Sequence, residues 1–251
     1  MIRYLTRLLS ILAIIAATAA GYEPNMLDMA VPTGLKPGQM EVRIQHRFLG
    51  RADKDPLGTL LGTDQGANPA MALRAPVWRS FELRAGYTRN QKEYSIGASY
   101  GAAIAAVHAR AQLSFEFFSY QKLGMDKRRQ NGFYLLSLQS GPVLGRARLG
   151  LNAGYDAYNL QAGIGIGALV GIAGPMSIIG EYYPTMGRTD SSTYLGPVNS
   201  MALGLRLDTY GHQFTILVGN NTEVGARRMM LGSPANRPYL GFVIQRRIEF
   251  N

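Results

Sequence analysis

Hydrophobic and polar residues alternate one by one along residues 107–118, V-H-A-R-A-Q-L-S-F-E-F-F. A period of two is that of a β-strand, whose side chains point alternately to opposite faces. One face of the predicted strand is wholly apolar and ends in two phenylalanines. The other carries His108, Arg110 and Glu116, which is too much charge for the dry interior of a β-sandwich. An apolar outer face, a polar inner face and an aromatic rim are typical of a transmembrane β-barrel strand.

The same alternation recurs along most of the chain and predicts about twelve strands. They are expected at residues 41–49, 67–75, 80–89, 93–101, 107–118, 133–141, 146–155, 159–172, 176–183, 200–208, 213–220 and 239–250. Residues 159–172 are apolar enough for a helix, but glycines recur there at alternate positions. Each would cost a helix roughly 1 kcal/mol, whereas in a strand they share one face. The predicted fold is a single antiparallel transmembrane β-barrel.

The connections between these strands alternate between short and longer ones. The longest are predicted at residues 50–66, 120–131, 184–197 and 221–238. Bacterial barrels have short periplasmic turns and longer external loops. With an even number of strands, this pattern places both chain ends in the periplasm of a protein of the bacterial outer membrane.

The barrel is preceded by two segments of different character. Residues 1–20 contain Arg3 and Arg7, a short apolar run and small residues suited to cleavage, as in a secretory signal peptide. The apolar run is shorter than the ~20 residues that span a bilayer, so we expect cleavage. Residues 21–39 are rich in proline and glycine and are expected to form a periplasmic strap or loop. It lies either under the barrel or partly inside it, and residues 40–251 form the outer-membrane barrel.

Composition excludes several classes of function. The chain has a formal net charge of +10 and no cysteine, so disulfides and thiolate-bound metals are excluded. Its basic residues are scattered rather than gathered on one helix, and no nucleic-acid partner is expected. The three histidines share no ligand spacing, so we expect neither a metal nor another cofactor.

A barrel enzyme is the first activity to consider. Outer-membrane phospholipases keep a serine two residues from a histidine on one strand. Here the corresponding residues after His46, His108 and His212 are phenylalanine, arginine and phenylalanine. We therefore expect no enzymatic activity and keep a lipid-modifying enzyme as a distant alternative.

The last predicted strand alternates apolar residues and ends in Phe250. This ending resembles the insertion signal of bacterial outer-membrane barrels. It implies the barrel-assembly machinery as a partner, with outer-membrane lipid and lipopolysaccharide around the barrel. Arg246 interrupts the apolar face, and an arginine facing lipid is costly near the bilayer centre. We expect it to snorkel toward the interface or to mark a β-bulge.

Several segments resemble a bacterial family of membrane-bound β-barrel proteins whose function is not assigned. They are His46-Arg47-Phe48, the G-x-D-x-G-A-N stretch at residues 62–68, and the hairpin E-L-R-A-G-Y-T-R followed by K-E-Y-S-I-G-A-S-Y at residues 82–100. The resemblance implies an outer-membrane barrel fold and lends no activity.

Ionisable residues on the inner face are the candidate functional residues. The predicted lumen-facing charge network comprises Arg43, Arg47, Glu82, Arg84, Glu93, His108, Arg110, Glu116, Arg146, Arg148, Glu181, Arg206, Asp208, Arg247 and Glu249. One interpretation is cross-strand ion pairing that fills a narrow barrel. The other is a water-filled pore with an arginine track for anionic solutes. Glycines at 163, 165 and 167 leave room for such a pore or for a plug formed by residues 21–39.

Three functions follow from these interpretations. The first is a passive channel for small hydrophilic solutes, with a preference for anions carried by inward arginines. The second is a closed structural or partner-binding barrel without transport. The third is the lipid-modifying enzyme.

Overall fold

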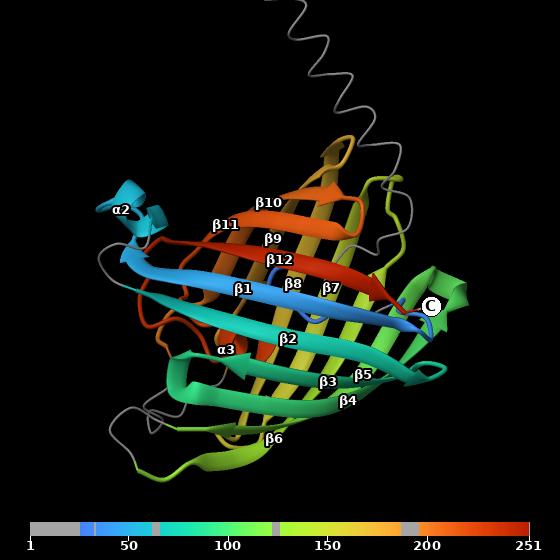
Figure 1. Cartoon of the computed structure of the whole chain (residues 1–251), viewed down its shortest axis with the longest axis horizontal. Coiled ribbons are helices and arrows are strands. Elements are labelled where there is room, and N and C mark those ends of the chain that lie inside the picture. Colours follow the sequence, from blue (N-terminus) through green and yellow to red (C-terminus); the bar gives the residue numbers. More distant parts are fainter. Residues whose placement is uncertain (1–25, 33, 62–65, 122–125, 187–195, 251) are drawn as a thin grey trace, which may run out of the picture.

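The computed structural model describes residues 26–250 except residue 33 and residues 62–65, 122–125 and 187–195. The predicted signal peptide lies outside the described residues. The described chain forms one closed barrel of twelve antiparallel strands (Figure 1). The strands are β1 (Gln39–Arg51), β2 (Ala67–Trp78), β3 (Phe81–Thr88), β4 (Glu93–Ile104), β5 (Ala109–Tyr120), β6 (Arg129–Ser140), β7 (Ala147–Asp156), β8 (Gln161–Ala173), β9 (Met176–Tyr183), β10 (Ser200–Thr209), β11 (His212–Gly219) and β12 (Tyr239–Glu249). The predicted fold class and all twelve predicted strands are confirmed.

The barrel closes through β1 and β12, the first and last strands. Their antiparallel register runs from Gln39 opposite Glu249 to Arg47 opposite Gly241. Every other strand pairs with its two neighbours in the sequence. Closure removes the unpaired edges of a sheet, which the interior of a bilayer does not tolerate.

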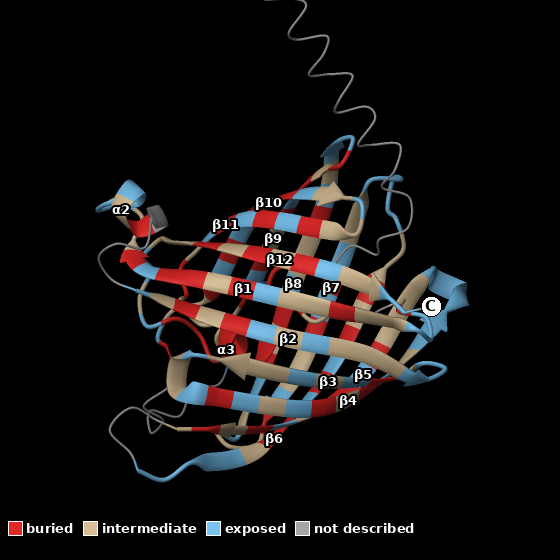
Figure 2. Ribbon diagram, in the orientation of Figure 1, coloured by how far each residue is buried: buried red, intermediate tan, exposed pale blue. Residues whose placement is uncertain are grey.

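The two faces of the strands differ as the alternation predicts. On β5, Leu113 is 64% exposed on the outer face, whereas its neighbour Gln112 is 2% exposed on the inner face. Buried and exposed residues follow one another along the strands in Figure 2. The apolar outer side chains therefore face the surroundings, and the polar ones face the lumen.

The two ends of the barrel carry different connections. The turn end, where β1 begins and β12 ends, holds the five connections β2–β3, β4–β5, β6–β7, β8–β9 and β10–β11. The loop end holds the other six, among them the longest. The loop from β1 to β2 contains α2 (Pro56–Leu61), and the loop from β11 to β12 contains α3 (Ala226–Met230). None of the described helices has the length and hydropathy needed to cross a membrane.

Arg246 lies on the outer face close to the turn end. It is exposed, and Val42 and His212 are its partners on the two neighbouring strands. The register of β12 with β1 shifts only between Arg47 and Arg51, so no bulge accompanies Arg246. Because β12 ends at Glu249, the guanidinium needs to reach only a short way to the rim, which agrees with snorkelling.

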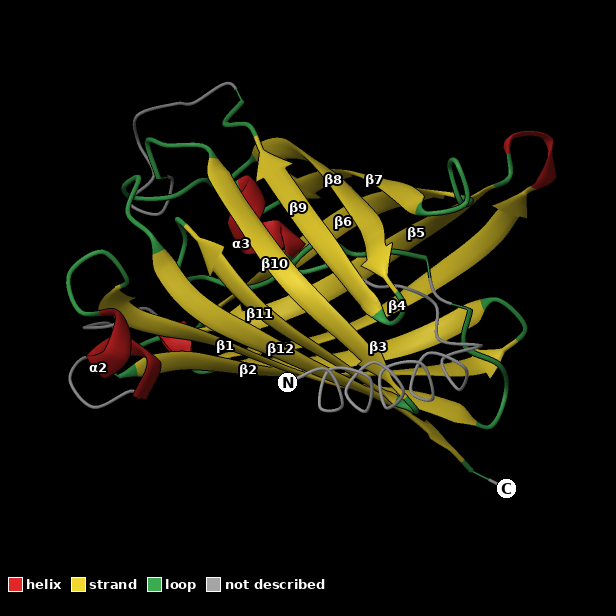
Figure 3. Ribbon diagram, turned by 90° about the horizontal axis from the view of Figure 1, so that it is seen from above, coloured by secondary structure: helices red, strands yellow, loops and turns green. Residues whose placement is uncertain are grey.

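Two segments from outside the wall fill the lumen. The N-terminal segment (residues 26–32 and 34–38) is exposed at residues 36–38, next to the start of β1 at the turn end, and its residues 26–32 lie inside the barrel. The lumen loop (residues 220–238) folds inward from the loop end, and Figures 1 and 3 show its helix α3 within the ring of strands. The sequence leaves open whether the residues before the barrel lie under it or partly inside it. The described part of this segment lies partly inside the barrel.

Each segment packs in an apolar cluster. The N-terminal segment cluster comprises Met26, Leu27, Met29, Val31, Leu169, Ile179, Ala202, Leu217 and Val243. The lumen loop cluster comprises Phe118, Tyr120, Phe133, Leu135, Tyr183, Ala226, Met229 and Met230. The wall residues of the first cluster come from β8 to β12, so the N-terminal segment lies against one side of the barrel.

We predict that Leu113→Arg destabilises the folded barrel in lipid by ~2–4 kcal/mol, because it places a charge on the outer face midway along β5. Ser114→Arg is the matched control, since Ser114 lines a polar cavity in the lumen. The measurement is urea unfolding of the protein in lipid vesicles. Equal destabilisation by the two substitutions would contradict the assignment of the faces.

Candidate functional site in the barrel lumen

Several glycines of the wall lie directly against the two inward segments. A Cβ atom on Gly150 would lie 2.6 Å from the sulfur of Met29, and one on Gly163 would lie 2.6 Å from Cβ of Met230. On β10, a Cβ atom on Gly204 would lie 2.8 Å from Cδ2 of Leu27. These wall glycines therefore make the room that the N-terminal segment and α3 occupy.

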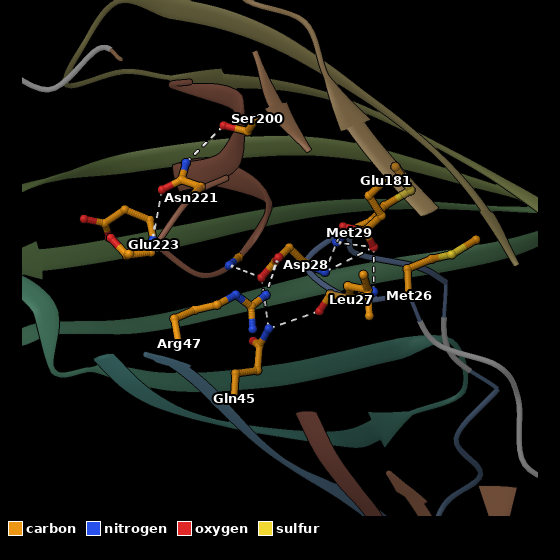
Figure 4. Close-up of polar contacts among 12 residues, drawn as sticks. Met26, Leu27, Asp28, Met29, Gln45, Arg47, Glu181, Ser200, Asn221 and Glu223 are labelled. Carbon is orange, nitrogen blue, oxygen red and sulfur yellow. Dashed lines mark hydrogen bonds and ion pairs between the residues drawn. The ribbon is translucent and has the colours of Figure 1, made fainter. Parts of the chain in front are cut away.

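Glu181 on β9 binds the backbone of the N-terminal segment. Its carboxylate accepts hydrogen bonds from the amides of Leu27, Asp28 and Met29 at 2.5, 2.9 and 3.2 Å (Figure 4). The hydroxyl of Tyr183 donates a further bond of 2.9 Å. Charge-assisted bonds of this kind are stronger than bonds between neutral groups, and they satisfy a carboxylate that is buried in the lumen.

Asp28 connects the N-terminal segment to β1 and to the lumen loop. Arg47 donates a hydrogen bond of 2.6 Å to one of its carboxylate oxygens, and the ion pair is almost fully buried. Gln45 and the backbone amide of Gly225 each donate a bond of 3.0 Å to the other oxygen. Figure 4 shows Asp28 between the wall side chains and the loop. One carboxylate thus joins three parts of the chain.

Arg227 and Arg228 of α3 fix the lumen loop to the wall. Arg227 donates to Asp156 at 3.0 Å, and both arginines donate to the buried carboxylate of Glu93. The guanidinium of Arg227 also lies 3.7 Å from the ring centroid of Phe118, within the range of a cation–π contact. Burial lowers the pKa of Arg227, but Glu93 and Asp156 raise it by more, so its pKa is above the ordinary value. Arg227 therefore remains charged.

Two polar cavities lie between these segments and the wall formed by β1 to β6. The upper cavity has a volume of about 180 Å³, and Arg43, Arg84 and Glu116 are among the residues that line it. The lower cavity, nearer the turn end, has a volume of about 240 Å³, and Glu82 and Arg110 are among its lining residues. Each is large enough to hold several water molecules.

Most of the predicted network faces the lumen in the structure. Arg47, Glu93 and Glu181 hold the inward segments. Arg206 and Asp208 pair with each other at 3.0 Å. Arg148 and Arg247 lie on the inner face of their strands, away from the contacts just described. The inner-face residues that line the two cavities are Arg43, Glu82, Arg84, Arg110 and Glu116.

Three predicted network residues have other positions. His108 is exposed in the turn before β5, because the strand begins only at Ala109 and His108 has a positive φ of 46°. Arg146 is exposed in the turn before β7. Glu249 is exposed at the turn-end rim, where Gln39 donates to it at 2.6 Å. All three lie at the ends of strands, where alternation no longer determines which way a side chain points.

The sequence interpretation missed the partners of the wall charges: Asp28, Asp156, Arg227 and Arg228. They lie in the inward segments or at the end of a strand, where no alternation marks them. One signal was available, because methionines recur in both segments, as Met26 and Met29 and as Met229 and Met230. Methionine suits irregular apolar interiors and argues against a fully exposed loop. Within the described residues, no group of three or more acidic, histidine or cysteine side chains is placed to hold a metal ion.

We predict that Arg227→Met releases α3 from the wall. Removing one partner of a buried ion pair typically costs about 3–5 kcal/mol. We expect this loss to lower the free energy needed to open the lumen loop locally. The Met229 amide of α3 donates a hydrogen bond to the carbonyl oxygen of Gly225, the residue before the helix, and its hydrogen exchange should become faster accordingly. Arg237→Met, at an exposed position of the same loop, is the control. Equal exchange in the two variants would show that the ion pairs do not hold α3.

Comparisons with known proteins agree with this architecture. Residues 135–247 match a family model described as "Membrane bound beta barrel domain (DUF5777)". The structure is similar to that of KdgM porin, with a TM-score of 0.52 and 9% identity over 83% of this chain and 98% of that chain. It also matches NanC porin, with a TM-score of 0.48 and 10% identity over 84% and 99% of the two chains. For outer membrane phospholipase A from Escherichia coli, the TM-score is 0.48, with 12% identity over 92% and 96%.

No curated protein sequence matches the chain. At 9% identity, the likeness to KdgM porin concerns the fold alone. The chain is therefore a membrane-bound β-barrel with a porin-like fold, and its resemblance to a family of membrane-bound β-barrel proteins is confirmed over residues 135–247.

Proposed function

We propose that this protein is an outer-membrane channel for small hydrophilic solutes and that the structure describes its closed form. The observation that carries the proposal is how the lumen is filled. Its occupants are segments from outside the wall, and the wall opposite them is lined by glycines such as Gly150 and Gly163. Wall side chains can fill the interior of a barrel of about eight strands by themselves, whereas this wall of twelve strands leaves room for other segments. The porin-like fold supports the same proposal.

The wall does not depend on the inward segments for its own hydrogen bonds. Each strand completes its ladder with two neighbouring strands, so departure of either segment breaks no bond between strands. What holds the segments is a small number of ionic and charge-assisted contacts, at Glu181, Asp28 and Arg227, together with the two apolar clusters. These contacts can open while the barrel stays closed as a sheet.

A closed structural or partner-binding barrel is the second candidate function. It is favoured by the nearly complete burial of the ion pair between Arg47 and Asp28 and by the apolar packing of both segments. This candidate predicts a folded protein that is silent in a bilayer even after its lumen has been emptied. The absence of enzymatic activity remains a prediction.

The preference for anions is the finer part of the proposal. The sequence indicates four inward arginines as its carriers: Arg84, Arg110, Arg146 and Arg148. Arg84 and Arg110 line the cavities, whereas Arg146 lies in a turn and Arg148 is not among the residues that line either cavity. Arg43 also lines the upper cavity. Charged groups that line a pore favour entry of ions of the opposite sign. We assign the preference to Arg43, Arg84 and Arg110.

The surroundings follow from a location in the outer membrane. Lipid and lipopolysaccharide would contact the apolar outer face, and the barrel-assembly machinery would bind the last strand with Phe250. The turn end and both termini would lie in the periplasm, with the loop end outside the cell.

We predict that cysteines at Asp126 and Asn236, both exposed at the loop end, react with a membrane-impermeant thiol reagent on intact cells. A cysteine at Leu144, 95% exposed at the turn end, should react only after the cells are broken. The native chain has no cysteine, so any labelling reports the introduced site. If only the Leu144→Cys variant were labelled on intact cells, the barrel would have the opposite orientation, with its turn end outside the cell.

We predict that emptying the lumen opens the channel. A variant lacking residues 26–35 should give stable open steps in planar bilayers where the native protein is mostly closed. The pair Asp28→Asn and Glu181→Gln should raise the open fraction as well, because loss of a buried charge partner costs about 3–5 kcal/mol. Asp208→Asn disturbs a lumen ion pair within β10 and should leave the open fraction unchanged. If the deletion variant folds but stays silent, the closed structural barrel is the better interpretation.

A further inference from the structure

The lumen is filled unevenly around its circumference. The N-terminal segment packs against residues of β8 to β12. The two polar cavities lie against the other strands, the upper one along β1 to β6 and the lower one along β3 to β5. Small inward residues such as Ala72, Gly86 and Ser95 line the upper cavity there. Open, polar space therefore remains between this wall and the face of the N-terminal segment that carries Asp28, Ala30, Pro32, Gly34 and Leu35.

The two cavities follow one another along the strands. On β3, Glu82 lines the lower cavity and Arg84, the next inward residue, lines the upper one. On β5, Gln112 lines the lower cavity and Ser114 the upper one. The boundary between the cavities falls at the same level on both strands.

A hydrogen-bonded bridge occupies this boundary. Arg84 donates to Oε1 of Gln112 at 2.6 Å. The amide nitrogen of Gln112 donates to Glu82 at 3.2 Å and to the hydroxyl of Ser99 at 3.0 Å. Gln112, Glu82 and Ser99 are all buried. Gln112 lies at the centre of this bridge and contacts each of the other three side chains.

We propose that solutes pass along the wall of β1 to β6, through both cavities, and that the Gln112 bridge is the constriction that selects them. The inference rests on the proposed channel function and specifies its route. The N-terminal segment stays in place, because the route does not cross its cluster. At the loop end the upper cavity is bounded by Arg227 and Arg228, so movement of the lumen loop opens the outer entrance.

The bridge also defines the class of solute. It presents a guanidinium, a carboxylate and a side-chain amide to the passage. Such groups replace the hydration of small polar solutes and exclude apolar ones. Arg84 favours anions and Glu82 favours cations, so each residue weakens the charge selectivity that the other creates. The constriction therefore suits small hydrophilic solutes, and the balance between these two residues sets the sign of its selectivity.

The test uses the full chain with the lumen loop released by Arg227→Met. In this background Gln112→Ala should increase the unitary conductance in planar bilayers. The matched control is Gln213→Ala, which removes an equally buried inward glutamine on β11 outside both cavities. In a salt gradient, Arg84→Gln should shift the reversal potential toward cation preference and Glu82→Gln toward anion preference. Folding of each variant is checked by its heat-dependent mobility on gels.

The possible results separate the inference from the proposed function. If the variant lacking residues 26–35 conducts but the loop-released chain does not, the N-terminal segment has to leave and the route is wrong. The route is also wrong if the loop-released chain conducts and the changes at Gln112, Arg84 and Glu82 alter neither conductance nor reversal potential. Silence of every folded variant, including the deletion, overturns the channel function and the route together.

Discussion

Every backbone amide inside a bilayer needs a partner within the protein, and the pairing of β1 with β12 meets this requirement for the whole sheet. Closure also fixes the size of the lumen, because the width of a barrel grows with the number of its strands. A ring of twelve strands with glycines at Gly150, Gly163 and Gly204 leaves space that its own side chains do not fill. That space holds either water or other segments of the same chain. The N-terminal segment and the lumen loop occupy much of it here, and polar cavities remain beside them.

The filled lumen explains why the wall charges are arranged as they are. A buried charge is costly unless it is paired and hydrogen-bonded. Glu181, Arg47 and Glu93 each find partners on a segment from outside the wall. The partners are therefore distributed over both segments. Asp28 joins the N-terminal segment to β1 through Arg47 and to the lumen loop through the amide of Gly225. A disturbance at Asp28 reaches the N-terminal segment and the lumen loop together.

The fold could be predicted from the sequence because the signal for a strand is local. Alternation determines which residues face the lumen wherever a strand is long, as for Gln112 and Leu113. It fails at strand ends, so His108 was assigned to the lumen although it lies in a turn. Only the wall residues of the site could be predicted. Asp28 and Gly225 are 197 positions apart, and their contact depends on where a loop without periodicity folds. The charges on the wall were predictable for this reason, and their partners were not.

The polar character of the closing contacts bears on the choice between a permanent and a reversible closure. Replacing buried ion pairs by apolar side chains often stabilises a protein, so a lumen that is always closed has little need of Glu181, Arg47 and Glu93. The same three residues also determine whether water enters the lumen once the segments have left. An apolar lining would exclude water and keep the passage closed by dewetting, whereas carboxylates and guanidinium groups attract water. The wall can therefore exchange its contacts with the segments for contacts with water. A lumen lined in this way is suited to both states, because its charged groups pair with the segments when these are bound and with water when they have moved.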